Sequence, residues 1–136
     1  MLTGAGVGRG AGIGPVVRVS PAPVAPTDEQ APADREATAA RATAAFDDVA
    51  AALRAQADGA EGAAVAVLQA TAQMAQDRAL RTKVLARIAD GEPPVAALDA
   101  VVKTFVDMFT AAGGMLLERV TDLRSVRDRV AAHLLG

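Results

Sequence analysis

Residues that could do acid–base or nucleophilic chemistry are few and scattered in this sequence. The only histidine, His133, lies near the expected end of a helix, where a cation is favoured. No second histidine and no paired group lie near it in sequence, which fits a surface histidine better than a base or a metal ligand. Ser20 and Ser125 have no histidine partner in a recognisable motif, and the chain has no cysteine. The residues alone therefore predict no catalytic site and no metal site.

Two further patterns suggest chemistry but fail on their context. Asp28-Glu29 and Asp47-Asp48 are adjacent acidic pairs, and neighbours on a helix point about 100° apart, so they fit solvated charges. Residues 6–11 match the looser glycine fingerprint of dinucleotide-binding proteins, which requires a strand before it and a helix after it. Only five residues precede Gly6, and Pro15 and a valine run follow, so we expect no dinucleotide site.

One group of residues is more typical of protein binding than of catalysis. It surrounds an expected break in a helix and comprises Thr71, Gln73, Met74, Asp77 and Leu80. Such a group could form an apolar patch with a polar rim, which often marks a binding surface for another protein. The alternative is that Met74 and Leu80 belong to the core, because the helical period places both partly inward.

A second candidate is a pair of arginines on either side of Asp122. Arg119 and Arg124 lie five residues apart, which separates them by about 140° around a helix. One arginine could therefore reach an anionic partner while the other contacts a neighbouring helix. An ordinary solvated helix face is the alternative.

Apolar periodicity predicts the elements that would position these residues. The clearest stripe lies within 115–135 and consists of Leu116, Val120, Leu123, Val126, Val130 and Leu134. Further helices are predicted over 33–56, over 95–112, and over 61–89 with a kink or brief break at residues 76 and 77, where Asp77 can cap a new turn. Short connections between these segments predict an all-α, antiparallel four-helix bundle with a kinked or broken second helix.

Residues 1–32 have a different composition. Glycine occupies positions 4, 6, 8, 10, 12 and 14, and proline occupies positions 15, 21, 23, 26 and 32. Residues 16–19 suggest a short strand, but a strand normally needs sheet neighbours, and this chain offers almost none. We therefore expect 1–32 to be mostly loose and 33–136 to form the helical domain.

Composition excludes several classes of function. The net charge is −2 and aromatic residues make up 2%, so the basic stripe and stacking aromatics of a nucleic-acid-binding protein are missing. No uncharged apolar run is long enough to cross a bilayer. Apolar residues make up 51%, with alanine prominent and Trp and Tyr absent, which favours helices. We expect a soluble, cytoplasmic protein with no membrane or nucleic-acid partner.

The order of these pieces resembles the N-terminal region of phosphoenolpyruvate–protein phosphotransferase, enzyme I of the bacterial sugar phosphotransferase system. Residues 118–126 look like that family's Glu-Arg-x-x-Asp-[Val/Leu]-Arg-[Asp]-[Ile/Val] segment, and residues 74–80 look like its Leu-Leu-Glu-Asp-x-x-Leu segment. Residues 1–19 are similar to its opening glycine-rich strand, and residues 134–136 end the region in the family's manner. The likeness covers most of the chain, and the 118–126 segment is its specific part.

That resemblance implies a helical subdomain that docks the phosphocarrier protein HPr. A separate α/β subdomain would carry the phosphorylated histidine, and a C-terminal barrel would bind phosphoenolpyruvate with magnesium. No cofactor is implied for this chain itself; magnesium is expected for the complete enzyme. By the same likeness, the positions associated with the HPr-docking face are Met74, Asp77, Leu80, Arg119 and Arg124, with Thr71 and Gln73 beside them.

The sequence also departs from the family's pattern. Residues 10–13 read Gly-Ala-Gly-Ile where the family usually has Ser-Pro-Gly-Ile, and Arg78 and Ala79 stand where acidic residues are common. Docking by opposite charge would then be weakened, or adapted to a less basic partner. The chain ends at Gly136, before the region where the family places its phosphoacceptor histidine, and His133 does not match that motif.

These observations predict the HPr-docking part of enzyme I, with no catalytic role of its own. Its partners would be HPr and the remainder of the enzyme. The alternative is a structural or self-assembling helical bundle without a catalytic role. An enzyme that acts alone fits least, because no catalytic constellation is present.

Overall fold

Five α-helices account for most of residues 22–136, the part of the chain that the computed structural model describes. They are α1 (Arg35–Asp58), α2 (Ala63–Ala75), α3 (Arg78–Ala89), α4 (Pro94–Ala112) and α5 (Leu116–Leu135), and these residues include no strand. The predicted all-α class is confirmed, and so is the broken second helix, whose two halves are α2 and α3. The predicted strand at residues 16–19 lies outside the described residues.

Local signals explain where the helices begin and end. The Asp34 carboxylate accepts a hydrogen bond from the Ala37 amide (3.0 Å), which caps α1. Asp77 does the same for α3: its backbone is extended and its side chain accepts from the Leu80 amide (2.9 Å). Pro94 opens α4, where a missing amide proton costs nothing, and Gly113 ends it with a positive φ of 67°.

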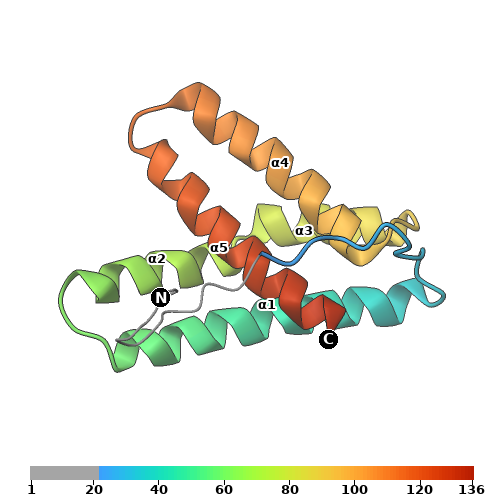
Figure 1. The fold of residues 1–136 in the computed structure, drawn as a ribbon, viewed down its shortest axis with the longest axis horizontal. Helices are drawn as coiled ribbons and strands as arrows, with labels where there is room; N and C mark the ends of the chain where they lie inside the picture. Colours follow the sequence, from blue (N-terminus) through green and yellow to red (C-terminus); the bar gives the residue numbers. More distant parts are fainter. Residues whose placement is uncertain (1–21) are drawn as a thin grey trace, which may run out of the picture.

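The helices are arranged as two hairpins that share one core (Figure 1). In the first, α2 and α3 run back along α1; in the second, α5 returns along α4. The second hairpin is inclined to α1, and its connecting turn lies far from α1, so α2 and the first half of α5 diverge (Figure 1). The finer prediction of an antiparallel four-helix bundle is not confirmed by this arrangement.

One apolar cluster at the centre of the molecule joins the two hairpins. Its fully buried large side chains are Phe46, Leu53, Leu80, Ile88, Leu98, Leu123 and five valines. The predicted stripe of α5 is buried from Leu123 onward, but Leu116 and Val120 are only half-buried. Because the hairpins diverge there, the first two turns of α5 leave the core and line an opening instead.

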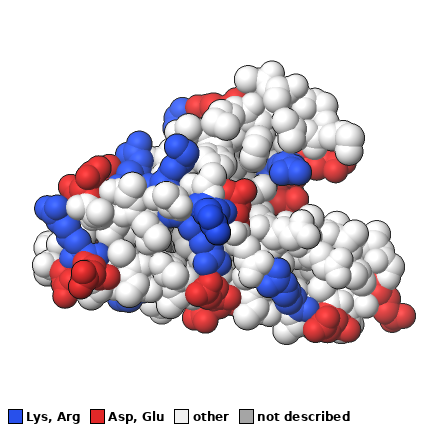
Figure 2. Space-filling model, turned by 180° about the vertical axis from the view of Figure 1, so that it is seen from behind, with Lys and Arg blue, Asp and Glu red and all other residues white. Residues whose placement is uncertain are grey.

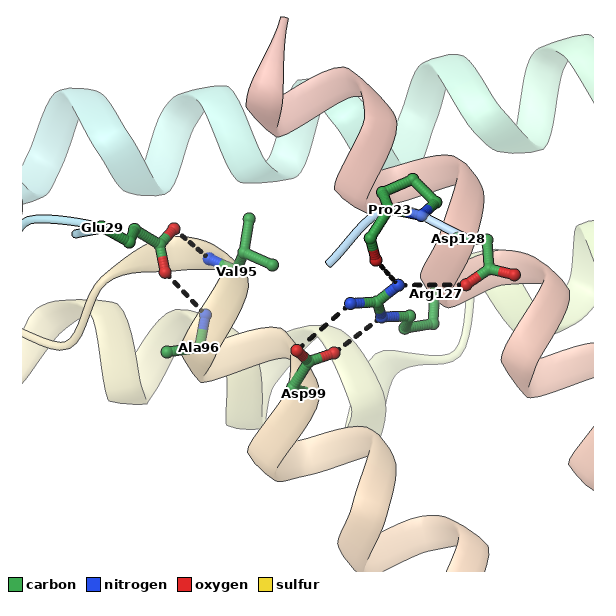
Figure 3. A network of polar contacts seen from close by, with 7 residues as sticks. All are labelled: Pro23, Glu29, Val95, Ala96, Asp99, Arg127 and Asp128. Atoms are coloured by element: carbon green, nitrogen blue, oxygen red, sulfur yellow. Dashed lines mark hydrogen bonds and ion pairs between the residues drawn. The ribbon is translucent and has the colours of Figure 1, made fainter. Parts of the chain in front are cut away.

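Residues 22–34 form neither helix nor strand, but they are attached to the helices at two points (Figure 3). The Glu29 carboxylate accepts hydrogen bonds from the first-turn amides of Val95 (2.8 Å) and Ala96 (3.0 Å) in α4. On α5, Arg127 donates to the Pro23 carbonyl, 104 residues away in sequence, and to Asp99 through Nε (2.6 Å). The described part of the segment predicted to be loose, residues 22–32, is therefore anchored.

The carboxylates beside Arg127 favour its charged form. The hydrogen bond from Arg127 to Asp99 raises the pKa of the guanidinium above its usual range, and Asp128 adds to the effect. Because the fold raises the pKa of Arg127, the stabilisation that its positive charge gives the folded state is complete at every pH below the ordinary arginine pKa. The Arg127 guanidinium therefore stays charged over the whole physiological pH range, and its own titration does not switch this attachment.

We expect Glu29→Ala to lower the free energy of unfolding by about 1–2 kcal/mol, because it removes two charge-assisted hydrogen bonds from the positive end of the α4 dipole. The exposed neighbour Asp28 provides a matched control, and Asp28→Ala should change stability by less than about 0.5 kcal/mol. Urea denaturation followed by circular dichroism measures both. Equal losses in the two variants would contradict a capping role for Glu29.

Candidate docking site

A cleft opens between α2 and the first half of α5, where the two hairpins diverge. Figure 2 shows it from behind, as the hollow between the arm formed by α4 and α5 and the arm formed by α1 and α2. Its volume is about 460 Å³, and it is lined by Ala70, Gln73, Met74, Asp77, Met115, Leu116, Glu118, Arg119 and Asp122. A second hollow shares Ala70, Glu118 and Asp122 and adds Ala66, Val67 and Thr121. We call the two together the α2–α5 cleft.

The α2–α5 cleft combines exposed apolar atoms with a few charges. On the α2 side, small alanines leave Val67 accessible, and 59% of its surface is exposed. On the α5 side, Met115 is 85% exposed and stands next to the charged residues Glu118 and Arg119. Accessible apolar side chains with a polar rim are typical of a surface that binds another protein.

Thr71 connects the two walls at the base of the cleft. Its hydroxyl lies 2.9 Å from the Val67 carbonyl of its own helix and 3.2 Å from the Asp122 carboxylate of α5, so it can donate its single proton to either. Thr71 is only 4% exposed. Its position indicates that it holds α2 against α5, whereas a docked partner would contact the residues above it.

The structure brings together four of the seven predicted site residues. Gln73, Met74, Asp77 and Arg119 line the α2–α5 cleft, with Gln73 and Arg119 exposed. Met74 is mostly buried and presents only an edge of its side chain, and the Asp77 carboxylate is already engaged as the cap of α3. The cleft is thus built from both of the segments that the sequence singled out.

The other three predicted residues do not line this cleft. Thr71 lies beneath it, and Leu80 is fully buried, which is the core placement that the helical period left open. Arg124 is exposed on another side of α5, in a hollow next to α4 that also contains Lys103 and Asp107. The separation of Arg119 from Arg124 around the helix accounts for their different surroundings.

Sequence reasoning missed several residues of the cleft. Ala66 and Ala70 carry no chemical signal, because their contribution is the space that a small side chain leaves. Glu118 lies inside the 118–126 segment and could have been included on that ground. Met115 follows Gly113 and Gly114, so its place beside α2 depends on the turn between α4 and α5.

His133, at the other end of α5, does not line the α2–α5 cleft. Within residues 22–136, no three histidine, aspartate or glutamate side chains are grouped so as to hold a metal ion. None of helices α1–α5 is both long and apolar enough to span a membrane.

Comparison with known proteins identifies the family. A family model described as "PEP-utilising enzyme, N-terminal" matches residues 3–119. The chain belongs to this family of N-terminal domains of phosphoenolpyruvate-utilising enzymes. One relative of this domain is the phosphoenolpyruvate-protein phosphotransferase of Streptomyces coelicolor, to which the chain is 41% identical over 92 residues. The resemblance to the N-terminal region of enzyme I is therefore confirmed.

This phosphoenolpyruvate-utilising N-terminal domain corresponds to only part of its relative. The aligned residues make up 68% of this chain but only 16% of the Streptomyces protein, so the chain spans a small part of that relative's length. The residues matched by the family model include all of α2 and α3 and the first turn of α5. Most of the lining of the α2–α5 cleft thus comes from the part that defines the family.

Proposed function

We propose that this domain docks the phosphocarrier protein HPr for a phosphoenolpyruvate–protein phosphotransferase, and that the α2–α5 cleft is the docking surface. The observation that carries the proposal is the meeting of two segments, residues 74–80 and 118–126, at one accessible cleft with both apolar and charged lining. Those are the segments in which the chain resembles enzyme I. The complete enzyme would pass a phosphoryl group from phosphoenolpyruvate through its own histidine to HPr, in cytoplasmic sugar uptake.

In this proposal the domain contributes affinity and orientation, while the bond-making groups come from other parts of the enzyme. Holding a phosphoryl donor and acceptor in a defined geometry makes transfer effectively unimolecular, and this is a separate contribution from the chemistry itself. The phosphoacceptor histidine and the magnesium-dependent phosphoenolpyruvate site would lie in the remainder of enzyme I. HPr and that remainder are the two partners we assign to the domain.

The charges around the cleft predict docking that depends only weakly on salt. The lining has three carboxylates, Asp77, Glu118 and Asp122, and one cation, Arg119, so its charges partly cancel. On α3, the exposed Arg78 follows directly after Asp77 and opposes its charge. We therefore expect apolar contacts to supply most of the affinity.

Calorimetric titration measures this salt dependence. Raising the salt from about 0.05 M to about 0.5 M, which shortens the Debye length from about 14 Å to about 4 Å, should weaken HPr binding by less than about threefold. A loss of more than about thirtyfold would instead indicate docking by opposite charge.

The same titration tests docking itself, and sedimentation tests the alternative of a self-assembling bundle. Docking predicts saturable 1:1 binding of HPr and a domain that sediments as a monomer on its own. The proposal fails if HPr produces no binding heat at millimolar protein. It also fails if the domain forms a stable dimer that covers the exposed Val67 and Met115.

A further inference from the structure

The break between α2 and α3 creates a structural problem close to the cleft. Where two helices meet end to end, the last carbonyls of the first and the first amides of the second lose their helical partners. Asp77 satisfies the α3 side by accepting from the Leu80 amide. On the α2 side, the Nε of Arg81 donates to the Ala75 carbonyl at 2.8 Å. Two side chains that belong to α3 and its cap, Asp77 and Arg81, therefore satisfy backbone groups on both sides of the break.

Arg81 also fastens the break to α1. Its Nη1 pairs with the Asp47 carboxylate at 2.7 Å, and its guanidinium carbon lies 5.3 Å from the ring centre of Phe46, in cation–π range. The Arg81 side chain is 18% exposed, and Phe46 is fully buried. One guanidinium thus contacts the end of α2, the surface of α1 and the core at the same time.

A second contact supports the same attachment. Arg54 of α1 donates to the side-chain carbonyl of Gln76, one of the two residues within the break. The Nη2 of Arg81 is buried and has no hydrogen-bond partner among the described residues, so that end of the group rests on packing rather than on polar contacts. The contacts of this guanidinium with Ala75, Asp47 and Phe46 can form together only when α1, α2 and α3 keep this arrangement.

We propose that Arg81 is a positioning residue for the docking site: it fixes the α2–α3 break against α1 and so holds Met74 and Asp77 at the cleft wall. Arg81 does not line the α2–α5 cleft, so it acts through the backbone on either side of the break. The inference rests on the proposed docking function for its effect on affinity. The rigidity of the break can be measured without any partner.

The test compares Arg81→Met with Lys83→Met by amide hydrogen exchange and by HPr titration. Methionine keeps much of the apolar stem of Arg81 and removes all of its polar contacts. Lys83 lies on the same helix, is exposed, and has the same charge, so its replacement controls for the change in net charge. We expect Arg81→Met to speed exchange about tenfold at residues 76–80, leave the buried half of α5 unchanged, and weaken HPr binding about fivefold to tenfold. Lys83→Met should change neither quantity by more than about twofold.

Arg81→Lys adds a second test that a change of charge cannot mimic. It keeps the cation for Asp47 but cannot reproduce the fork that reaches Ala75 and Asp47 together, so we expect exchange at the break to stay fast. The inference is overturned if both Arg81 variants exchange like the unmodified domain at residues 76–80. It is also overturned if exchange rises equally in all five helices, which would mean a general loss of stability. Failure of the unmodified domain to bind HPr would count against the proposed function, while the exchange data would still decide the role of Arg81 at the break.

Discussion

Replacing Ala70 with arginine should abolish HPr docking while leaving the domain folded. Ala70 is exposed in the middle of α2 and lines both hollows of the α2–α5 cleft. An arginine there would place a long cation across the apolar wall, and helix propensity would hardly change, because alanine and arginine are both strong helix formers. We expect the affinity to fall by at least about a hundredfold, as is typical when the centre of an interface is blocked.

Ala51 provides the matched control for this substitution. It is an equally exposed alanine within a helix, on α1 and outside the cleft lining. Ala51→Arg should bind HPr within about twofold of the unmodified domain, and both variants should show its helical circular dichroism. If Ala70→Arg bound HPr as tightly as Ala51→Arg, docking at this cleft would be wrong.

The largest expected effect on stability comes from Leu123→Ala, which should lower the free energy of unfolding by about 3–5 kcal/mol. Leu123 is fully buried where α5 crosses into the shared core, and its truncation removes apolar contact and leaves a cavity. For a domain of this size the total is about 5–15 kcal/mol, so one such loss is a large fraction of it. Urea unfolding measures the change directly.

Leu117 offers the comparison on the same helix. It is 49% exposed, so Leu117→Ala should cost less than about 1 kcal/mol. Comparable losses at the two leucines would contradict the observed division of α5 into a buried second half and a first half that leaves the core.

Elements set by local signals could be predicted well from the sequence. The helix expected over 115–135 is α5, Leu116–Leu135, and the break expected at residues 76 and 77 falls there because Asp77 is a good cap. Hydrophobic period and capping act over a few residues, so they can be read without tertiary information.

Features that depend on distant contacts could not be predicted. The anchoring of residues 22–34 comes from Glu29 and Arg127, whose partners lie many tens of residues away. Arg127 directly follows Val126 of the predicted apolar stripe, and Asp99 and the Pro23 carbonyl accept its hydrogen bonds. Contacts between residues so far apart leave no pattern in the local sequence.

Only part of the candidate site could be predicted from the sequence. The expected helix break and the arginine pair, both of which the resemblance to enzyme I also marks, include Gln73, Met74, Asp77 and Arg119, which the fold does bring to one cleft. They also include Leu80, which helical period alone had left between core and surface and which is core. The alanines and the exposed Met115 depend on how far the two hairpins diverge, and the sequence does not show that angle.

The central claim is that one cleft between α2 and α5 receives HPr, and nuclear magnetic resonance tests it most directly. Unlabelled HPr would be titrated into the ¹⁵N-labelled domain, and chemical-shift changes of the backbone amides would be followed over residues 22–136. The account predicts the largest shifts at Ala70, Gln73, Asp77 and Arg119, with Lys83 and Asp48, exposed outside the cleft, unchanged. Shifts centred instead on Arg124 and Lys103, or no shifts at millimolar HPr, would contradict it.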